Sequence, residues 1–256
     1  MSSLKQRFDI ILQDLEEQGS VRVAELSQKL DCSEVTIRSD IAKLDKQKLL
    51  KKTYGGAIKL EETFEIALEP GEIYLNREKK YKIAEKAYSY INNRESIILD
   101  DSTTAYYLAK YICEHESMRV VVVTNSIATA AILTKARHVE LFLIGGGVIG
   151  NPPSALDNIA VNFLDQFHVD KAFVGINGIN LRVGLTSIGT PQMEVKRKMI
   201  QVAQETIVLA DSTKFGNGNL FTVCAFDQIA RIITDSDITA ESIALAKEEN
   251  VNIEVV

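Results

Sequence analysis

The chain has 256 residues, 46% of them hydrophobic, and a formal net charge of −6. This length accommodates one large domain and one small domain, each with a core of its own. The sequence contains no apolar run near the roughly 20 residues that cross a bilayer, and its start, "MSSLKQRFDII", lacks the features of a signal peptide. These properties argue against a membrane protein and predict a cytoplasmic one.

Cysteine and histidine residues are scattered along the chain, at Cys32, Cys113, Cys224, His115, His138 and His168. None of them forms a closely spaced pair of the kind that binds zinc or builds a disulfide framework. The sequence therefore predicts neither a metal site nor a cofactor, and no activated nucleophile marks a catalytic centre.

The charged residues are unevenly distributed. Residues 1–60 contain 11 Lys and Arg against 9 Asp and Glu, whereas residues 61–256 contain 18 against 26. Residues 38–59 alone hold seven basic and two acidic residues. Because only a patch of a protein has to face phosphates, this segment is compatible with nucleic-acid binding despite the acidic total. A solvated surface produces the same pattern.

Residues 1–60 contain three helical patterns. The first has an apolar stripe made of Leu4, Phe8, Ile11, Leu12 and Leu15. Its helix should end near Gly19. After the short alternating segment "SVRV", the segment "AELSQKL" predicts a second helix. Ser33 is a suitable N-cap for a third helix, whose buried face carries Ile37, Ile41 and Leu44.

At 100° per residue, the third helix turns a small, polar face away from its buried stripe. This face suits insertion into the major groove of DNA, because its side chains are short and its far end is basic. Arg38 and Asp40 flank the face, where Arg38 can reach a phosphate or a base edge and Asp40 can orient a base or an arginine. The expected DNA-contacting residues here are Ser33, Val35, Thr36, Arg38, Ser39, Lys43 and Lys46.

The next segment, "LLKKTYGGAIKL", predicts a strand, a glycine turn and a second strand. Gly55 and Gly56 permit positive φ at the turn. Lys51, Lys52 and Tyr54 then lie on a wing beside the helices and join the expected DNA contacts. A helix-turn-helix followed by a basic wing is more specific than a basic cluster alone, and it predicts binding of double-stranded DNA.

The remaining residues have a different organisation. Residues 61–78 are acidic and contain a proline and a glycine, which suggests a linker. From residue 79 on, helical segments such as "KIAEKAYSYI" alternate with short apolar segments such as "SIILD", "VVVVTN" and "TIVLADS". This alternation predicts an α/β domain with a mostly parallel sheet covered by helices on both faces. We therefore expect a winged helix-turn-helix domain at 1–60, a linker at 61–78 and an α/β domain at 79–256.

Five of the predicted strands end in polar residues or glycines, at residues 100–104, 124–126, 145–147, 175–178 and 211–214. Ligands of open α/β sheets bind at the carboxyl ends of the strands, where glycines admit backbone N–H groups and helix N-termini favour anions. We therefore expect one crevice lined by all five segments, although tight turns alone also produce such endings.

Within this crevice, the hydroxyl groups and amides of residues 102–104 can hold a phosphate, or they can merely cap the following helix. Lys214 can neutralise an anion, and carboxylates and amides can bind sugar hydroxyl groups. The expected ligand-binding residues are Asp100, Ser102, Thr103, Thr104, Thr124, Asn125, Ser126, Gly145, Gly146, Gly175, Asn177, Gly178, Glu194, Asp211 and Lys214.

The segments "VRVAELSQKLDCSEVTIRSDIAKL", "LDDSTTA", "AFVGINGI", "EVKRKMI" and "LADSTKFG" resemble the DeoR-type bacterial transcription regulators, and the resemblance covers nearly the whole chain. It implies a repressor of a sugar-metabolism operon and a homodimer or higher homo-oligomer. It also implies a sensor domain similar to the sugar-phosphate isomerase and CoA-transferase fold, with a phosphorylated sugar as effector.

The sequence departs from the family's pattern at three positions that bear on function. Ser39 stands where the family usually has a second arginine, Tyr54 where it usually has a histidine before the double glycine, and Asp101 where it commonly has glycine or serine. Because a second carboxylate would repel a phosphate, either Asp101 points away from the phosphate site or the phosphate lies elsewhere.

Two other interpretations stay open. Carboxylates and a lysine are available for proton transfer, so the chain can also be a sugar-phosphate isomerase-like enzyme that carries a DNA-binding domain. A fold does not carry an activity, however, and turnover of sugar phosphates would distinguish this alternative. The winged helix can also serve protein assembly, and a strongly salt-dependent affinity for DNA would argue against that function.

Overall fold

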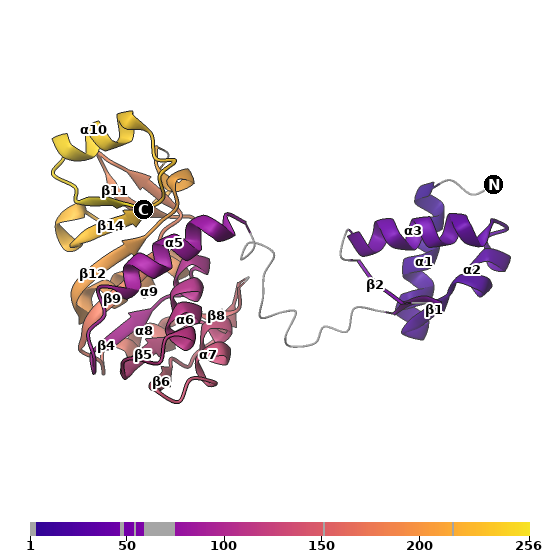
Figure 1. Ribbon diagram of the computed structural model, residues 1–256, viewed down its shortest axis with the longest axis horizontal. Coiled ribbons are helices and arrows are strands. Elements are labelled where there is room, and N and C mark those ends of the chain that lie inside the picture. The colour runs from indigo at the N-terminus through magenta and orange to yellow at the C-terminus, as the bar shows by residue number, and fades with distance from the viewer. Residues whose placement is uncertain (1–3, 47–48, 54, 59–74, 151, 217) are drawn as a thin grey trace. The chain divides into compact units, whose positions relative to one another are not determined.

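The computed structural model of the chain describes residues 4–46, 49–53, 55–58, 75–150, 152–216 and 218–256. It divides into two compact units, Met1–Ile66 and Ala67–Val256 (Figure 1). Most of the expected linker lies outside the described residues, and residues 77–78 begin the first helix of the second unit. No helix among the described residues is long and apolar enough to cross a membrane.

The first unit is a helix-turn-helix with a small sheet. Its described elements are α1 (Leu4–Gln18), β1 (Ser20–Arg22), α2 (Val23–Lys29), α3 (Glu34–Lys46), β2 (Lys51–Lys52) and β3 (Gly56–Ile58). The strands form an antiparallel sheet in the order β1-β3-β2, so that β2 and β3 make the wing. The predicted helix-turn-helix and wing are therefore confirmed.

Apolar stripes hold this unit together. Ile11 and Leu15 of α1 pack in one core with Ile37, Ile41 and Leu44 of α3. The positions repeat at intervals of three and four residues, which places them on one face of each helix. Two residues mark helix ends. Ser33 caps the start of α3, where its Oγ accepts a hydrogen bond of 3.2 Å from the backbone N–H of Thr36. Gly19, with φ +71°, follows the end of α1.

Two expectations about this unit are wrong. Asp40 does not flank a DNA-facing surface, because its carboxylate is buried and accepts a hydrogen bond of 2.6 Å from Arg7 Nε on α1. Neither Gly55 nor Gly56 has a positive φ. Gly56 is needed for a different reason, since a β-carbon there would overlap the carbonyl oxygen of Val21 in the neighbouring β1.

The second unit contains a seven-stranded parallel sheet in the order β15-β14-β12-β9-β4-β5-β6 (Figure 1). The strands of this sheet are β4 (Ser96–Leu99), β5 (Val120–Thr124), β6 (Val139–Leu143), β9 (Val169–Gly175), β12 (Ala203–Leu209), β14 (Arg231–Thr234) and β15 (Ile253–Val255). The described helices are α5 (Arg77–Tyr88), α6 (Thr103–Glu114), α7 (Ile127–Leu133), α8 (Asn158–Leu164), α9 (Thr190–Val202) and α10 (Ala240–Glu248), with 3₁₀ turns η2 (Ser212–Lys214) and η3 (Phe226–Gln228). The predicted α/β organisation is confirmed.

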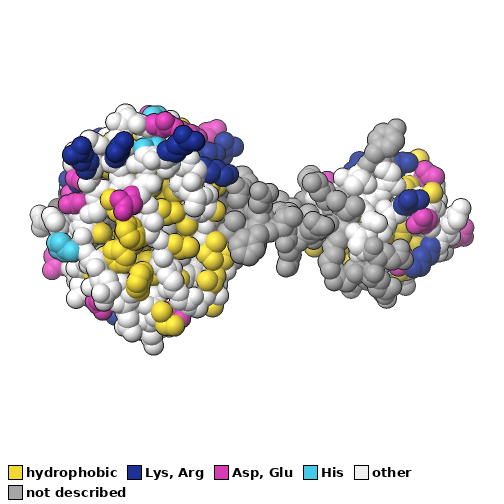
Figure 2. All heavy atoms as spheres, turned by 90° about the horizontal axis from the view of Figure 1, so that it is seen from below, with side chains coloured by type: hydrophobic (Ala, Val, Ile, Leu, Met, Phe, Trp, Pro, Cys, Tyr) yellow, Lys and Arg dark blue, Asp and Glu magenta, His cyan; other side chains and the backbone are white. Residues whose placement is uncertain are grey.

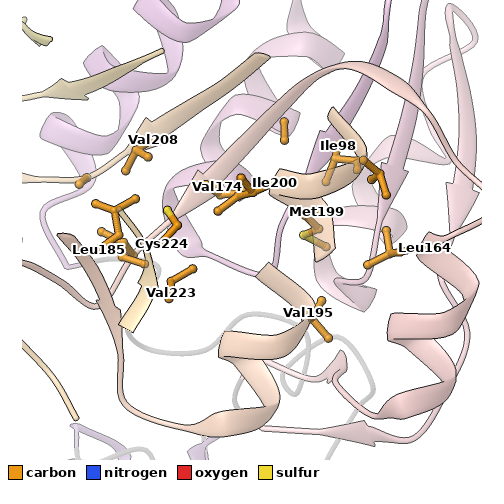
Figure 3. Packing of buried hydrophobic residues seen from close by; sticks show 14 of the residues in the cluster. Ile98, Leu164, Val174, Leu185, Val195, Met199, Ile200, Val208, Val223 and Cys224 are labelled. Carbon is orange, nitrogen blue, oxygen red and sulfur yellow. The ribbon is translucent and has the colours of Figure 1, made fainter. Parts of the chain in front are cut away.

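Alternating side chains of the strands enter two cores, one on each face of the sheet. Ile97 and Leu99 of β4 pack with residues of α5, α6 and α7, whereas Ile98 between them packs with residues of α8, α9 and α10. Figure 3 shows the second of these cores, where Met199 and Val195 of α9 lie near Ile98 and Leu164. The period of two that places successive side chains on opposite faces explains why consecutive residues of β4 and β5 are apolar.

The sequence analysis did not predict the short strands that lie beside the main sheet. They are β7 (Val148–Ile149), β8 (Ser154–Ala155), β10 (Gly178–Asn180), β11 (Gly184–Ser187) and β13 (Phe221–Cys224). β7 and β8 form a hairpin, and β10, β11 and β13 form a separate antiparallel sheet. Strands of two to four residues are too short to show a periodic pattern.

Large hydrophobic side chains are exposed around the edge strand β6, at Phe142, Leu143, Val148, Ile149, Ile159 and Phe163. Their side chains are 41 to 64% exposed. Figure 2 shows hydrophobic side chains gathered on one face of the second unit. Such apolar surface is typical of contacts between protein molecules.

Candidate functional site

The exposed face of α3 carries several of the side chains expected to contact DNA. Val35 is 77% exposed, and Ser39 and Lys43 are exposed on the same helix. Ser33 Oγ lies 2.9 Å from Thr36 Oγ1, so these two hydroxyl groups bond to each other at the start of the helix. Arg38 is exposed and forms an ion pair of 3.2 Å with Glu34 one turn earlier. The face is therefore small, polar and accessible, as a groove-reading helix requires.

The wing is tied to the end of α3. The backbone N–H of Lys52 donates to Asp45 Oδ1 over 2.9 Å, and the Lys52 side chain is exposed. Lys46 belongs to α3 and Lys51 to β2, but their side chains, and all of Tyr54, lie outside the described residues. The structure thus fixes β2 beside α3, which keeps a basic wing close to the exposed helix face.

The second unit contains a cavity of about 250 Å³ at the carboxyl ends of β4, β9 and β12. Its wall includes expected ligand-binding residues from three strand ends, namely Ser102, Thr103, Thr104, Gly175, Asn177, Asp211 and Lys214. Asp101, Gln192 and Lys196 contribute further polar groups. The predicted position of a ligand site at this edge of the sheet therefore coincides with a cavity.

The expectation that all five strand ends line one cavity is wrong for two of them. Residues 124–126 are buried and serve the fold. Asn125 Nδ2 donates to the carbonyl oxygen of Ala155 over 3.2 Å, and Ser126 Oγ accepts from the N–H of Thr129 to cap α7. Thr124 Oγ1 accepts from the N–H of Ser126.

Four further expected residues lie away from the cavity wall. Gly145 and Gly146 belong to the exposed segment after β6. The next residue, Gly147, donates its N–H to Asp157, which also caps α8. Gly178 is buried in β10, and Glu194 is exposed on α9. None of these four residues is part of the cavity wall.

Asp100 lies beneath the cavity and organises its floor. Its carboxylate is completely buried and accepts hydrogen bonds from the backbone N–H and Oγ of Ser102, at 3.0 and 2.6 Å. The N–H of Gly175 donates to the other carboxylate oxygen over 2.8 Å. A β-carbon at Gly175 would overlap the Ser102 side chain, so glycine lets the end of β9 approach the start of α6.

Lys196 is a charged residue of the cavity wall that the sequence analysis did not predict. It lies on α9, is 5% exposed, and forms ion pairs with Asp100 and, at 3.1 Å, with Asp101. Burial alone would lower the pKa of Lys196, but the two carboxylates outweigh burial and raise the pKa above its ordinary value. Lys196 is therefore a cation. Its position on the buried stripe of α9, one turn before Met199 and Ile200, is the sequence feature that marks it.

Asp101 does not point away from the cavity but contributes to its wall. Its carboxylate is neutralised in part by Lys196, which shares its charge between Asp100 and Asp101. The described wall contains the acidic residues Asp101 and Asp211 and three lysines, Lys80, Lys196 and Lys214. A cavity with this balance can accept an anion without the repulsion that Asp101 alone would cause.

Several donors converge on the cavity. Ser102 Oγ caps α6 by accepting the N–H of Ala105, which leaves the hydroxyl groups of Thr103 and Thr104 and the first N–H groups of the helix near the cavity wall. Asp211 Oδ1 accepts from the N–H of Thr213 at 3.0 Å and so shapes the turn that carries Lys214. Lys214 is half-buried and forms no ion pair within the described part of the chain.

No group of three or more metal-ligating side chains was found within the described ranges of the chain. The cavity instead combines ammonium groups, hydroxyl groups, amides and a helix N-terminus. Such groups are chemically suited to a small, oxygen-rich anion, because ammonium and N–H groups favour negative charge and amides or carboxylates bind hydroxyl groups.

Comparisons with known proteins match both units. Residues 7–63 match the family model of the DeoR-like helix-turn-helix domain, and residues 75–236 match that of the DeoR C terminal sensor domain. The second unit also has a partial likeness to ribose 5-phosphate isomerase A from Methanocaldococcus jannaschii, with a TM-score of 0.41, 21% identity, and 55% of each chain covered. A likeness this low bears on neither activity nor ligand.

Curated relatives align along nearly the full length. An uncharacterized HTH-type transcriptional regulator, YulB of Bacillus subtilis, is 32% identical over 98% of this chain and 96% of its own. A putative aga operon transcriptional repressor of Escherichia coli O157:H7 is 32% identical over 99% of this chain and 94% of its own. With both domains in the same order as in these relatives, the chain belongs to the DeoR family of helix-turn-helix transcription regulators.

Proposed function

We propose that the protein is a repressor of a sugar-metabolism operon, and that a phosphorylated sugar in the cavity of the second unit controls its affinity for operator DNA. The observation that carries this proposal is the cavity at the ends of β4, β9 and β12, where Lys214, the start of α6 and several hydroxyl groups converge. Two relatives support the repressor function by their names, a putative aga operon transcriptional repressor and the HTH-type transcriptional repressor GlcR of Bacillus subtilis.

The cavity suggests how such a ligand would lie. Its phosphate would meet the hydroxyl groups of Thr103 and Thr104, the N-terminus of α6 and the ammonium group of Lys214. Its sugar hydroxyl groups would bond to Asn177, Gln192 and the Asp101 carboxylate. A panel of sugar phosphates, tested by thermal shift against the same sugars without phosphate, would identify the ligand, because binding to the folded state alone raises its stability.

We also propose that the protein lacks isomerase activity. The buried Asp100 and Lys196 at the cavity are paired with each other, which leaves neither of these two groups poised for proton transfer. Turnover of any sugar phosphate in the thermal-shift panel would contradict this proposal.

Binding to an operator implies action in the cytoplasm and, for paired half-sites, a homodimer or higher homo-oligomer. The exposed apolar residues around β6 support self-association through the second unit. Sedimentation at several protein concentrations would measure the oligomeric state.

Replacing Lys214 with alanine is expected to weaken binding of the effector sugar phosphate by about 10- to 100-fold, since a charge-assisted hydrogen bond contributes about 1.5–3 kcal/mol. Operator affinity of the ligand-free protein should stay unchanged, because Lys214 belongs to the second unit. Titration calorimetry and operator binding at one fixed salt concentration measure the two quantities. Lys198→Ala, a change of a lysine on α9 that pairs with Asp165, is the control. An unchanged effector affinity for Lys214→Ala would place the phosphate elsewhere.

The double change Lys51→Ala and Lys52→Ala is expected to weaken binding to operator and to unrelated DNA alike, because a wing beside the duplex meets phosphates first. The slope of the logarithm of affinity against the logarithm of salt concentration should become shallower by roughly one to two units. Fluorescence anisotropy at several salt concentrations measures this slope. Lys135→Ala, which removes an exposed lysine of the second unit, should leave it unchanged. If the double variant also kept the wild-type slope, the wing would not contact DNA.

A further inference from the structure

The start of α5 forms one wall of the ligand cavity. Leu75, Asn76 and Lys80 all line it. Asn76 has a left-handed backbone, with φ 55°, and its carbonyl oxygen accepts the N–H of Lys80 over 3.0 Å. Residue 75 continues directly into the chain segment that leads back to the first unit. The cavity wall therefore includes the first described residues of the second unit on the side of the chain that leads to the DNA-binding unit.

Lys79 anchors this same helical turn to η2 and to the segment that follows β14. Its ammonium group lies 3.0 Å from Asp235 Oδ1 and 2.8 Å from Asp237 Oδ2, and it donates to Ser212 Oγ over 3.3 Å. The Asp235 carboxylate also accepts two hydrogen bonds from Ser212, from its backbone N–H at 2.6 Å and from its hydroxyl group at 2.9 Å. Lys79, Asp235 and Ser212 thus form one network that joins α5, the end of β14 and η2.

This network ends at the residue proposed to bind the phosphate. Ser212 is the first residue of η2, whose Thr213 and Lys214 line the cavity. Ser212 is bonded to Asp235, which also pairs with Lys79. The start of α5 and η2 therefore share one set of contacts beside the cavity, and both contribute residues to its wall.

The remainder of α5 is fixed to the body of the unit. Ile83, Ala84 and Ala87 are fully buried in the core, and Lys86 forms an ion pair of 2.7 Å with Glu254 on β15. The first turn places no hydrophobic side chain in the core: Leu75 before it is 65% exposed, Asn76 provides no side-chain cap, and the polar contacts of Lys79 hold the turn. The first turn is therefore the part of α5 whose stability a ligand can change most.

We propose that occupation of the cavity is transmitted to the DNA-binding unit through the first turn of α5, which a bound anion holds against η2 by way of Asn76, Lys80 and the Lys79–Asp235–Ser212 network. This inference rests on the proposed function of the cavity as the effector site. The chemical group that triggers the response is the phosphate, because it is the part of the ligand that meets Lys214. Coupling of this kind needs only that the ligand stabilise one arrangement of the turn over another.

Hydrogen exchange of the full-length protein tests the proposal, with inorganic phosphate as the probe and potassium chloride of equal ionic strength as the reference. Phosphate is expected to slow amide exchange at least about threefold both at residues 102–105 and at residues 75–82. Slower exchange at residues 102–105 alone would overturn the proposed transmission while leaving the ligand site in place. Unchanged exchange at both segments would contradict the ligand site and the transmission together.

Two lysines of α5 provide a matched pair of variants. Lys79→Met removes the network beside the cavity, whereas Lys86→Met removes an ion pair of the same kind at the other end of the helix. In Lys79→Met, phosphate should still protect residues 102–105, but its effect on residues 75–82 should fall by at least half. In Lys86→Met, both effects should equal those of the wild type.

A wild-type response of residues 75–82 in Lys79→Met would overturn the proposal. If Lys79→Met does not fold, Asp237→Asn is the variant that tests the proposal. It removes the charge of one partner of Lys79 and leaves Asp235 in place, and it should not prevent folding because the Asp237 side chain is 68% exposed. The same partial loss of protection at residues 75–82 is expected there, and an undiminished response would equally overturn the proposal.

Discussion

Replacing Lys196 with methionine is expected to lower the free energy of unfolding of the second unit by about 3–5 kcal/mol, the usual cost of removing one partner of a buried ion pair. The change leaves the buried Asp100 carboxylate without its cation, and it also removes the ion pair between Lys196 and Asp101. For a domain of this size the loss corresponds to a melting temperature lower by roughly 10 °C. Circular dichroism during urea and thermal unfolding measures both quantities.

The control for this variant lies two residues away on the same helix. Lys198→Met removes an ion pair of 2.7 Å with Asp165, whose side chain is 54% exposed, and should cost no more than about 1 kcal/mol. The double variant Lys196→Met with Asp100→Asn should recover part of the loss, because it removes the unpaired charge of the fully buried Asp100. Equal effects of Lys196→Met and Lys198→Met would show that the buried pair does not stabilise the cavity floor.

The charge state of Lys196 also gives the expected pH dependence. Its pKa is raised in the folded protein, so its contribution to stability is complete below the pKa of an unfolded lysine, about 10.4, and is lost only as the pH rises through the still higher folded value. The contribution of Lys196 should therefore be undiminished at neutral pH.

Replacing Ile41 with alanine is expected to unfold much of the DNA-binding unit while the second unit stays intact. Ile41 is 1% exposed in the core between α1 and α3, and deleting such a side chain costs about 2–5 kcal/mol. A unit of this size has a total stability of roughly 3–10 kcal/mol, so operator affinity should fall in proportion to the folded fraction. Because the protein has no tryptophan, circular dichroism at 222 nm and limited proteolysis are suitable measurements.

Val35→Ala is the matched control on the same helix. Val35 is 77% exposed, so its truncation should change stability by less than about 0.5 kcal/mol. If Ile41→Ala lowered the unfolding transition of the second unit as much as that of the first, the two units would not fold independently.

The elements of both units could be predicted because their patterns are local. An apolar residue every three to four positions places Ile37, Ile41 and Leu44 on one side of α3 wherever that helix packs. In the same way, the continuous apolar strands require a sheet buried on both faces, and their polar ends point to a ligand site at one edge. These conclusions depend on backbone periodicity and residue type alone.

Other features depend on which distant segments meet, and no local pattern contains that information. Residues 124–126 end a strand as residues 100–104 do, yet packing of the β7–β8 hairpin encloses them, with Ala155 bonded to Asn125. Asp40 resembles a surface residue in the helical pattern, but α1 brings Arg7 against it. Side-chain burial of this kind follows from tertiary contacts across the chain.

The cavity itself is assembled from segments separated by more than a hundred residues. The sequence alone predicts that Lys214 and residues 102–104 lie at strand ends, and such ends share one edge of a parallel sheet. The sequence alone does not predict that Lys196 of α9 pairs with Asp100, or that Lys79 and Lys80 of α5 lie near η2. Helices cover a sheet at positions set by the order of its strands and by side-chain packing, so the charges that complete the site are determined only when the whole domain has folded.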